Sequence, residues 1–176
     1  MLDTSGRVIY VGSFSKSILA TLRVGFIVAP PSLNNALRAA KFVADWHTSL
    51  PLQAALADFI AEGLFARHVR RMRRVYEQRH DLVRRGIQGA FAHEFELVPS
   101  SLGLHMTILA RSATIREVEE VAKEASLVGV ETTPLSAYVV GSQARAGIIL
   151  GYGAIATDRI EEGLERLRRT ARLVAR

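Results

Sequence analysis

The chain has 176 residues, of which 49% are hydrophobic and 23% are charged, and its formal net charge is +6. It is long and apolar enough to bury one sizeable core, so we expect a globular protein. The absence of cysteine excludes disulfides, thiolate catalysis and cysteine-ligated metal. No apolar stretch reaches the roughly 18–20 residues that a membrane span needs. We therefore expect a cytoplasmic protein with no membrane partner and no metal site.

Two short apolar runs near the start of the chain predict a pair of buried strands, at residues 8–12 and 24–29. The second run ends at a pair of prolines, which cannot continue a strand in the middle of a sheet. The loop between the two runs consists mainly of small residues and contains Lys16.

Helical signals follow the prolines. Ser32 is expected to cap a helix that ends near residues 46–48, and Pro51 suits the first turn of a second helix that ends near Gly63. Apolar residues then recur at helical spacing through an arginine-rich stretch. This pattern predicts a long amphipathic helix over residues 64–89.

Beyond this helix the pattern changes to alternating strands and helices. Thr114 and Glu117 form a capping box that opens a helix to about Ser126, and Thr157 with Asp158 is expected to cap a last amphipathic helix. The strands of this part are expected at residues 95–98, 104–109, 128–132 and 148–152.

These elements predict an α/β chain whose first third is the end of a larger α/β layer. The expected parts are residues 1–63, the C-terminal part of a large domain; residues 64–89, a connecting helix; and residues 90–176, a small α/β domain.

Lysine occurs only at positions 16, 41 and 123, whereas arginines are spread along the whole chain. Because arginine cannot form a Schiff base, covalent amine chemistry is to be sought at the lysines. Partial desolvation between two buried strands would favour a neutral Lys16 amine that can attack an aldehyde. Arg23 can bind a phosphate through two parallel hydrogen bonds. From spacing alone, the alternative is a surface lysine and a strand-edge arginine.

The segment at residues 6–16, GRVIYVGSFSK, with its continuation at residues 22–28, LRVGFIV, resembles the lysine region of fold-type-I aminotransferases, which use pyridoxal 5'-phosphate (PLP). It is most similar to the MocR/GabR family, in which a winged helix-turn-helix DNA-binding domain of the GntR type precedes an aminotransferase-like domain. Further similar pieces extend the resemblance over nearly the whole chain: residues 56–60 with Gly63, residues 67–73 with Tyr76, residues 103–105 and residues 150–152.

The resemblance implies the C-terminal portion of the PLP-dependent transferase fold and a role for five residues. The implied roles are Lys16 as the Schiff-base lysine, Ser13, Ser15 and Arg23 around the cofactor phosphate, and Arg145 at a substrate carboxylate. Many aminotransferases carry that arginine on the following strand, where this chain has Ile149. A solvated arginine before a strand is the alternative for Arg145.

In complete members of this family, several groups that hold PLP precede the lysine, among them an aspartate paired with the pyridine nitrogen. We therefore expect the chain to be part of a longer regulator. By itself it is expected to bind PLP weakly or not at all and to lack transaminase activity. Because the active site of this fold forms at a subunit interface, a homodimer is expected.

Three functions remain open. The parent protein is either a sensor of an amino acid or keto acid, which binds DNA only through a separate N-terminal domain, or a genuine amino acid aminotransferase. A third possibility is that the arginine-rich helix at residues 64–89 binds nucleic acid. Glu77 and Asp81 interrupt its positive charge, which suits a solvated face better.

Overall fold

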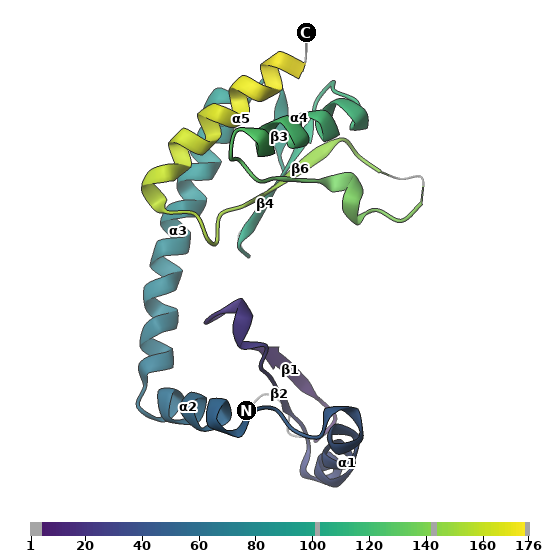
Figure 1. Ribbon diagram of the computed structural model, residues 1–176, viewed down its shortest axis with the longest axis vertical. Helices are drawn as coiled ribbons and strands as arrows, with labels where there is room; N and C mark the ends of the chain where they lie inside the picture. The colour runs from purple at the N-terminus through teal and green to yellow at the C-terminus, as the bar shows by residue number, and fades with distance from the viewer. Residues whose placement is uncertain (1–4, 101–102, 142–143, 175–176) are drawn as a thin grey trace. The chain divides into compact units, whose positions relative to one another are not determined.

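A computed structural model describes residues 5–100, 103–141 and 144–174 (Figure 1). The chain divides into two compact units, residues 1–72 and 73–176. The boundary falls within one long helix, α3 (Leu64–Ala90), close to the predicted helix at residues 64–89. None of the described helices, α3 included, is both long enough and apolar enough to cross a membrane.

The first unit begins with an antiparallel hairpin of β1 (Tyr10–Ser13) and β2 (Gly25–Val28), in which Tyr10 pairs with Val28. Both strands were predicted, but their predicted burial is wrong: Val11 is 69% exposed and Ile27 is 53% exposed. The two strands form a sheet of their own. Successive side chains of a strand point to opposite faces of the sheet, and those of β1 and β2 are exposed on both faces apart from the half-buried Gly12.

Two helices and a preceding 3-10 turn follow the hairpin and lead to the first turns of α3: η2 (Pro31–Leu33), α1 (Asn34–Asp45) and α2 (Leu50–Ala61). Ser32 does not cap α1, because it lies inside the turn that Pro31 begins, and α1 has no side-chain cap. Pro51 lies in the first turn of α2, as predicted. Gly63 follows α2 with a φ of +72°, a conformation that glycine adopts without steric cost.

The second unit is a four-stranded antiparallel sheet with the strand order β3-β4-β6-β5. Its elements are β3 (Phe95–Leu97), β4 (His105–Ala110), α4 (Ile115–Leu127), β5 (Thr133–Pro134), β6 (Gly147–Gly151) and α5 (Ile160–Val174). The fully buried Ile108 and Ile148 pair across β4 and β6. They form one core with Ile87 of α3, Val118 of α4 and Leu167 of α5, so helices cover one face of this sheet.

The strand predicted at residues 128–132 is absent, because α4 ends there in a closed turn. Gly129 has a φ of +79°, and the backbone N–H of Val130 donates to the carbonyl of Ala125 at 2.9 Å. This pattern satisfies the last carbonyls of a helix. The backbone becomes extended only at β5 (Thr133–Pro134), directly after the range in which the strand was predicted.

The two predicted helix starts of the second unit behave differently. The capping box is confirmed: Thr114 Oγ1 accepts from the N–H of Glu117 at 3.3 Å, and Glu117 Oε2 accepts from the N–H of Thr114 at 2.7 Å. Thr157 instead lies in a 3-10 turn, η4 (Thr157–Arg159), that leads into α5 without a side-chain cap. Its hydroxyl accepts a hydrogen bond from Arg79 Nε at 3.3 Å.

Replacing Thr114 by alanine tests this cap. The loss of the Thr114 hydroxyl is expected to lower the free energy of unfolding by about 1 kcal/mol near neutral pH, whereas Thr114→Ser retains it. The backbone N–H and the hydroxyl of Thr114 lower the pKa of Glu117 below its ordinary value of 4.5. Because the pKa of Glu117 is lower in the folded than in the unfolded chain, the ionised carboxylate stabilises the fold at pH values above 4.5. This stabilisation is lost as the pH falls through the pKa that Glu117 has in the folded chain. The cost of Thr114→Ala, measured by urea unfolding, is therefore expected to shrink in acid; a pH-independent cost would contradict this.

Candidate functional site

The predicted lysine lies in a tight turn at the end of β1. The N–H of Ser15 donates to Ser13 Oγ at 3.1 Å, and the N–H of Ile18 donates to the carbonyl of Phe14 at 2.8 Å. Serine favours such local bonds between side chain and backbone. Lys16 is therefore presented at the centre of a turn whose backbone is closed on both sides.

A small apolar core supports this turn. Phe14, Val24 and Leu56 are each no more than 8% exposed, and the Phe14 ring contacts the Phe65 ring edge-on at a centroid distance of 5.7 Å. The N–H of Phe14 donates to the carbonyl of Val24 at 3.0 Å. Because Phe14 and Val24 are near neighbours in sequence of Lys16 and Arg23, this bond keeps both candidate residues at one end of the hairpin.

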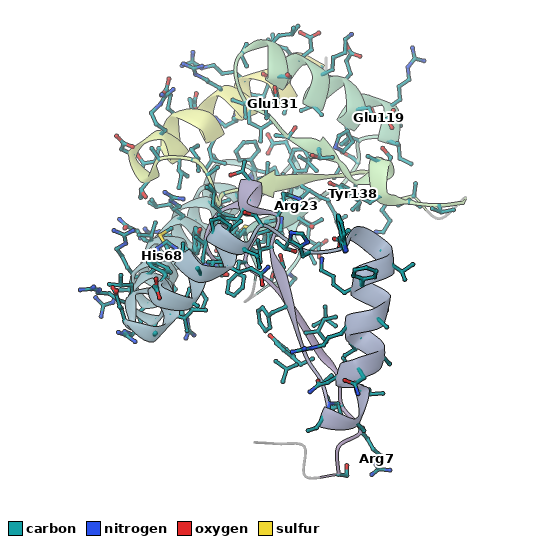
Figure 2. The ribbon with its side chains drawn as sticks, turned by 60° about the horizontal axis from the view of Figure 1, so that its bottom comes forward. Arg7, Arg23, His68, Glu119, Glu131 and Tyr138 are labelled. Carbon is teal, nitrogen blue, oxygen red and sulfur yellow. The ribbon has the colours of Figure 1, made fainter. Side chains whose placement is uncertain are left out.

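Arg23 occupies an unusual backbone conformation directly before β2. It follows a 3-10 turn, η1 (Ala20–Leu22), and has φ 51° and ψ 34°, in the left-handed region. For a residue with a Cβ this conformation costs roughly 1 kcal/mol, and such strain often marks functional positions. Figure 2 shows Arg23 and Arg7 at opposite ends of the hairpin.

Lys16, Ser13 and Arg23 are exposed and Ser15 is half-buried. The expected partial desolvation of Lys16 is therefore not found, because the strands that flank its loop are themselves uncovered. Lys16 nevertheless differs from the other two lysines. Lys41 is paired with Asp45 at 2.6 Å and Lys123 with Glu120 at 3.2 Å, whereas no carboxylate of the described residues lies within ion-pair distance of Lys16.

Arg145 belongs to the second unit, where it is exposed and lies two residues before β6. Ile149 lies on β6 itself, opposite Thr107 of β4 and Thr133 of β5. These three residues are half-buried. The role of Arg145 at a substrate carboxylate stays a prediction.

Sequence reasoning gave no role to His68, which lies in the first turns of α3. Its Nε2 lies 3.0 Å from the carbonyl oxygen of Ser17, the residue after Lys16. The two residues are 51 positions apart. Helical periodicity describes only which face His68 shares with its neighbours, so it carried no signal for this contact.

Several arginines of α3 make hydrogen bonds or ion pairs within the second unit. Arg79 Nη1 donates to the carbonyl of Gly153 at 2.6 Å, and Arg84 is paired with Asp81 at 3.3 Å. The Nε of Arg85 donates to the carbonyl of Asp81 at 3.3 Å. These bonds hold the guanidinium groups of Arg79, Arg84 and Arg85 against partners within the unit, so these three arginines do not form one free phosphate-binding ridge.

Comparison with known proteins gives a consistent picture. The model of the family described as aminotransferase class I and II matches residues 2–168. The probable rhizopine catabolism regulatory protein MocR of Rhizobium meliloti is 40% identical over 95% of this chain, and the uncharacterized HTH-type transcriptional regulator YhdI of Bacillus subtilis is 33% identical over 95%. The chain spans about a third of the length of these two relatives, 34% and 35% respectively.

Solved structures show the fold. LysN, an α-aminoadipate aminotransferase from Thermus thermophilus that was crystallised with N-(5'-phosphopyridoxyl)-L-leucine, matches 96% of this chain with a TM-score of 0.81 and 27% identity. The aromatic aminotransferase Aro9 of C. albicans matches 98% with a TM-score of 0.83 and 22% identity. The chain covers 42% and 40% of these structures. The predicted fold, a portion of an α/β aminotransferase, is confirmed.

Proposed function

Because this chain belongs to the aminotransferase class I and II family, we propose that it is part of the PLP-binding effector domain of a MocR-type transcriptional regulator. The identity of 40% to a regulator over nearly the whole chain supports a regulator rather than an enzyme. In this proposal Lys16 binds PLP covalently. An amino acid or keto acid is the effector, the domain is a homodimer, and a separate N-terminal domain binds DNA.

The observation that carries the proposal is the pairing pattern of the three lysines. Lys41 and Lys123 are held by carboxylates, whereas Lys16 has no carboxylate partner among the residues that the structure describes. The Lys16 amine is therefore available for a covalent bond without first breaking an ion pair. It also lies at the same end of the hairpin as Arg23, whose guanidinium can bind an anion.

The residues around Lys16 fit an aldehyde that carries a phosphate. The oxygen of Ser13 accepts from the N–H of Ser15, so the hydrogen of the Ser13 hydroxyl remains free to donate to a phosphate oxygen. Ser15 offers a second hydroxyl, and Arg23 offers a forked cation. PLP supplies an aldehyde that condenses with an amine and a ring that withdraws electrons. Arg145 would bind the carboxylate of the amino acid or keto acid.

A second candidate function is amino acid transamination. It is favoured by the solved structures that share this fold, which are aminotransferases. The two functions differ in their products: an enzyme converts an added amino acid to its keto acid under turnover, whereas a sensor binds it without accumulating product.

The proposal is tested by trapping PLP on the chain and mapping the modified lysine. The protein is incubated with excess PLP, reduced with borohydride and digested, and the phosphopyridoxyl groups on the three lysine peptides are quantified by mass spectrometry. Modification is expected to favour Lys16 over Lys41 and Lys123, and inorganic phosphate is expected to compete. Pyridoxal, which lacks the phosphate, is the matched control. Equal labelling of the three lysines by both aldehydes would refute the site.

A further inference from the structure

The turn that carries Lys16, residues 13–18, is called the lysine turn here. Two contacts from the first turns of α3 hold it. Phe65 packs its ring edge-on against Phe14, which precedes Lys16 by two positions. His68 contacts the carbonyl of Ser17, which directly follows Lys16. Residues three apart lie on one face of a helix. The same face of α3 therefore meets the turn on both sides of Lys16, with an apolar contact on one side and a polar contact on the other.

We propose that His68 is a positioning residue for Lys16. This inference rests on the proposed function of Lys16. Among residues 15–19, all of which the structure describes, the bond from His68 to the carbonyl of Ser17 is the one hydrogen bond to a distant part of the chain. The other hydrogen bonds of this segment stay within the turn or connect it to its near neighbours. The bond from His68 therefore adds a contact with α3 to the local bonds that hold the peptide after Lys16.

The chemistry of the contact fixes the state of the imidazole ring. A carbonyl oxygen only accepts hydrogen bonds, so Nε2 of His68 has to carry a hydrogen. The neutral tautomer protonated at Nδ1 cannot make this bond. His68 is half-buried, which limits the water available to replace the imidazole as the donor to Ser17.

The contact also makes the lysine turn depend on α3. A ligand that displaces the first turns of α3 moves the carbonyl of Ser17, and with it the Lys16 backbone. By linkage, a group bound covalently at Lys16 biases the position of α3 in return. In a regulator, this dependence connects the occupancy of Lys16 to the first turns of α3, where Phe65 and His68 lie.

Two variants separate the hydrogen bond from packing. His68→Leu removes the donor and retains an apolar side chain of similar bulk. His68→Gln places an amide N–H near the position of Nε2 and is the conservative rescue. The first readout is PLP labelling of Lys16, expressed relative to Lys41 of the same molecule. His68→Leu is expected to lower this ratio about two- to tenfold, the range that one neutral hydrogen bond produces, and His68→Gln is expected to restore most of it.

The second readout needs no cofactor. Amide hydrogen exchange of Lys16, Ser17 and Ile18, measured by NMR, is expected to quicken in His68→Leu and to return toward the wild-type rate in His68→Gln. The imidazole ¹⁵N shifts of the wild-type chain are expected to show a hydrogen on Nε2. A ring protonated only at Nδ1, or unchanged labelling and exchange in His68→Leu, would overturn the inference.

The outcomes also separate this inference from the proposed function. If the wild-type chain shows no preference of PLP for Lys16, the proposed function fails, while the exchange rates and the tautomer still decide whether His68 holds the turn. If the preference is present but is the same in His68→Leu, the function stands and the positioning role fails. If His68→Gln behaves as His68→Leu, the ring and not its hydrogen bond supports the turn, which also overturns the inference.

Discussion

Replacing Phe91 by alanine is expected to lower the free energy of unfolding of the second unit by about 3–5 kcal/mol. Phe91 follows α3 and is 1% exposed, and its ring meets that of Phe95 at a centroid distance of 6.1 Å. It packs into the same core as Ile108 and Ile148. Truncation removes a large apolar surface and leaves a cavity between helix and sheet. Because small domains are stable by only about 5–15 kcal/mol, this change removes much of the total.

Urea unfolding followed by far-UV circular dichroism measures the loss. Leu173→Ala is the matched control, because Leu173 lies on α5 of the same unit and is 72% exposed. Its effect is expected to stay within about 0.5 kcal/mol. A cost for Phe91→Ala as small as that of Leu173→Ala would show that the core is not packed as described.

Replacing Arg23 by glycine is expected to weaken phosphate binding without lowering the free energy of unfolding. Glycine adopts the left-handed conformation of this position freely, so the backbone strain of roughly 1 kcal/mol is relieved. The same change removes the forked cation proposed to bind the PLP phosphate. Losing a charged hydrogen-bonding partner costs about 1.5–3 kcal/mol of binding free energy, which corresponds to a roughly ten- to hundredfold weaker affinity. The concentration of inorganic phosphate that halves PLP labelling of Lys16 is expected to rise by that factor.

Two further variants make this experiment specific. Arg23→Lys retains the charge but not the fork and is expected to be intermediate in phosphate competition. Arg38→Ala removes an exposed arginine of α1 in the same unit and is expected to leave the competition unchanged. Phosphate competition in Arg23→Gly that equals that of the wild-type chain would remove Arg23 from the proposed site.

The sequence by itself determined the elements whose signals are local. The capping box at Thr114, the proline in the first turn of α2, the glycine after it and the stripe of α3 all act through neighbours within a few residues. Hydrogen bonds and steric limits at that range depend little on the rest of the fold. The resemblance that predicts a role for Lys16 rests likewise on a contiguous segment, residues 6–16, and that role stays a prediction.

Tertiary structure decided which of these elements are covered and which distant groups meet. The apolar runs of β1 and β2 predicted buried strands, yet burial depends on layers that other parts of a fold supply, and the two strands are exposed. The hydrogen bond from His68 to Ser17 joins residues 51 positions apart. The spacing of apolar residues in the sequence indicates which face of a helix or strand a side chain lies on. Which other segment packs against that face depends on the tertiary structure.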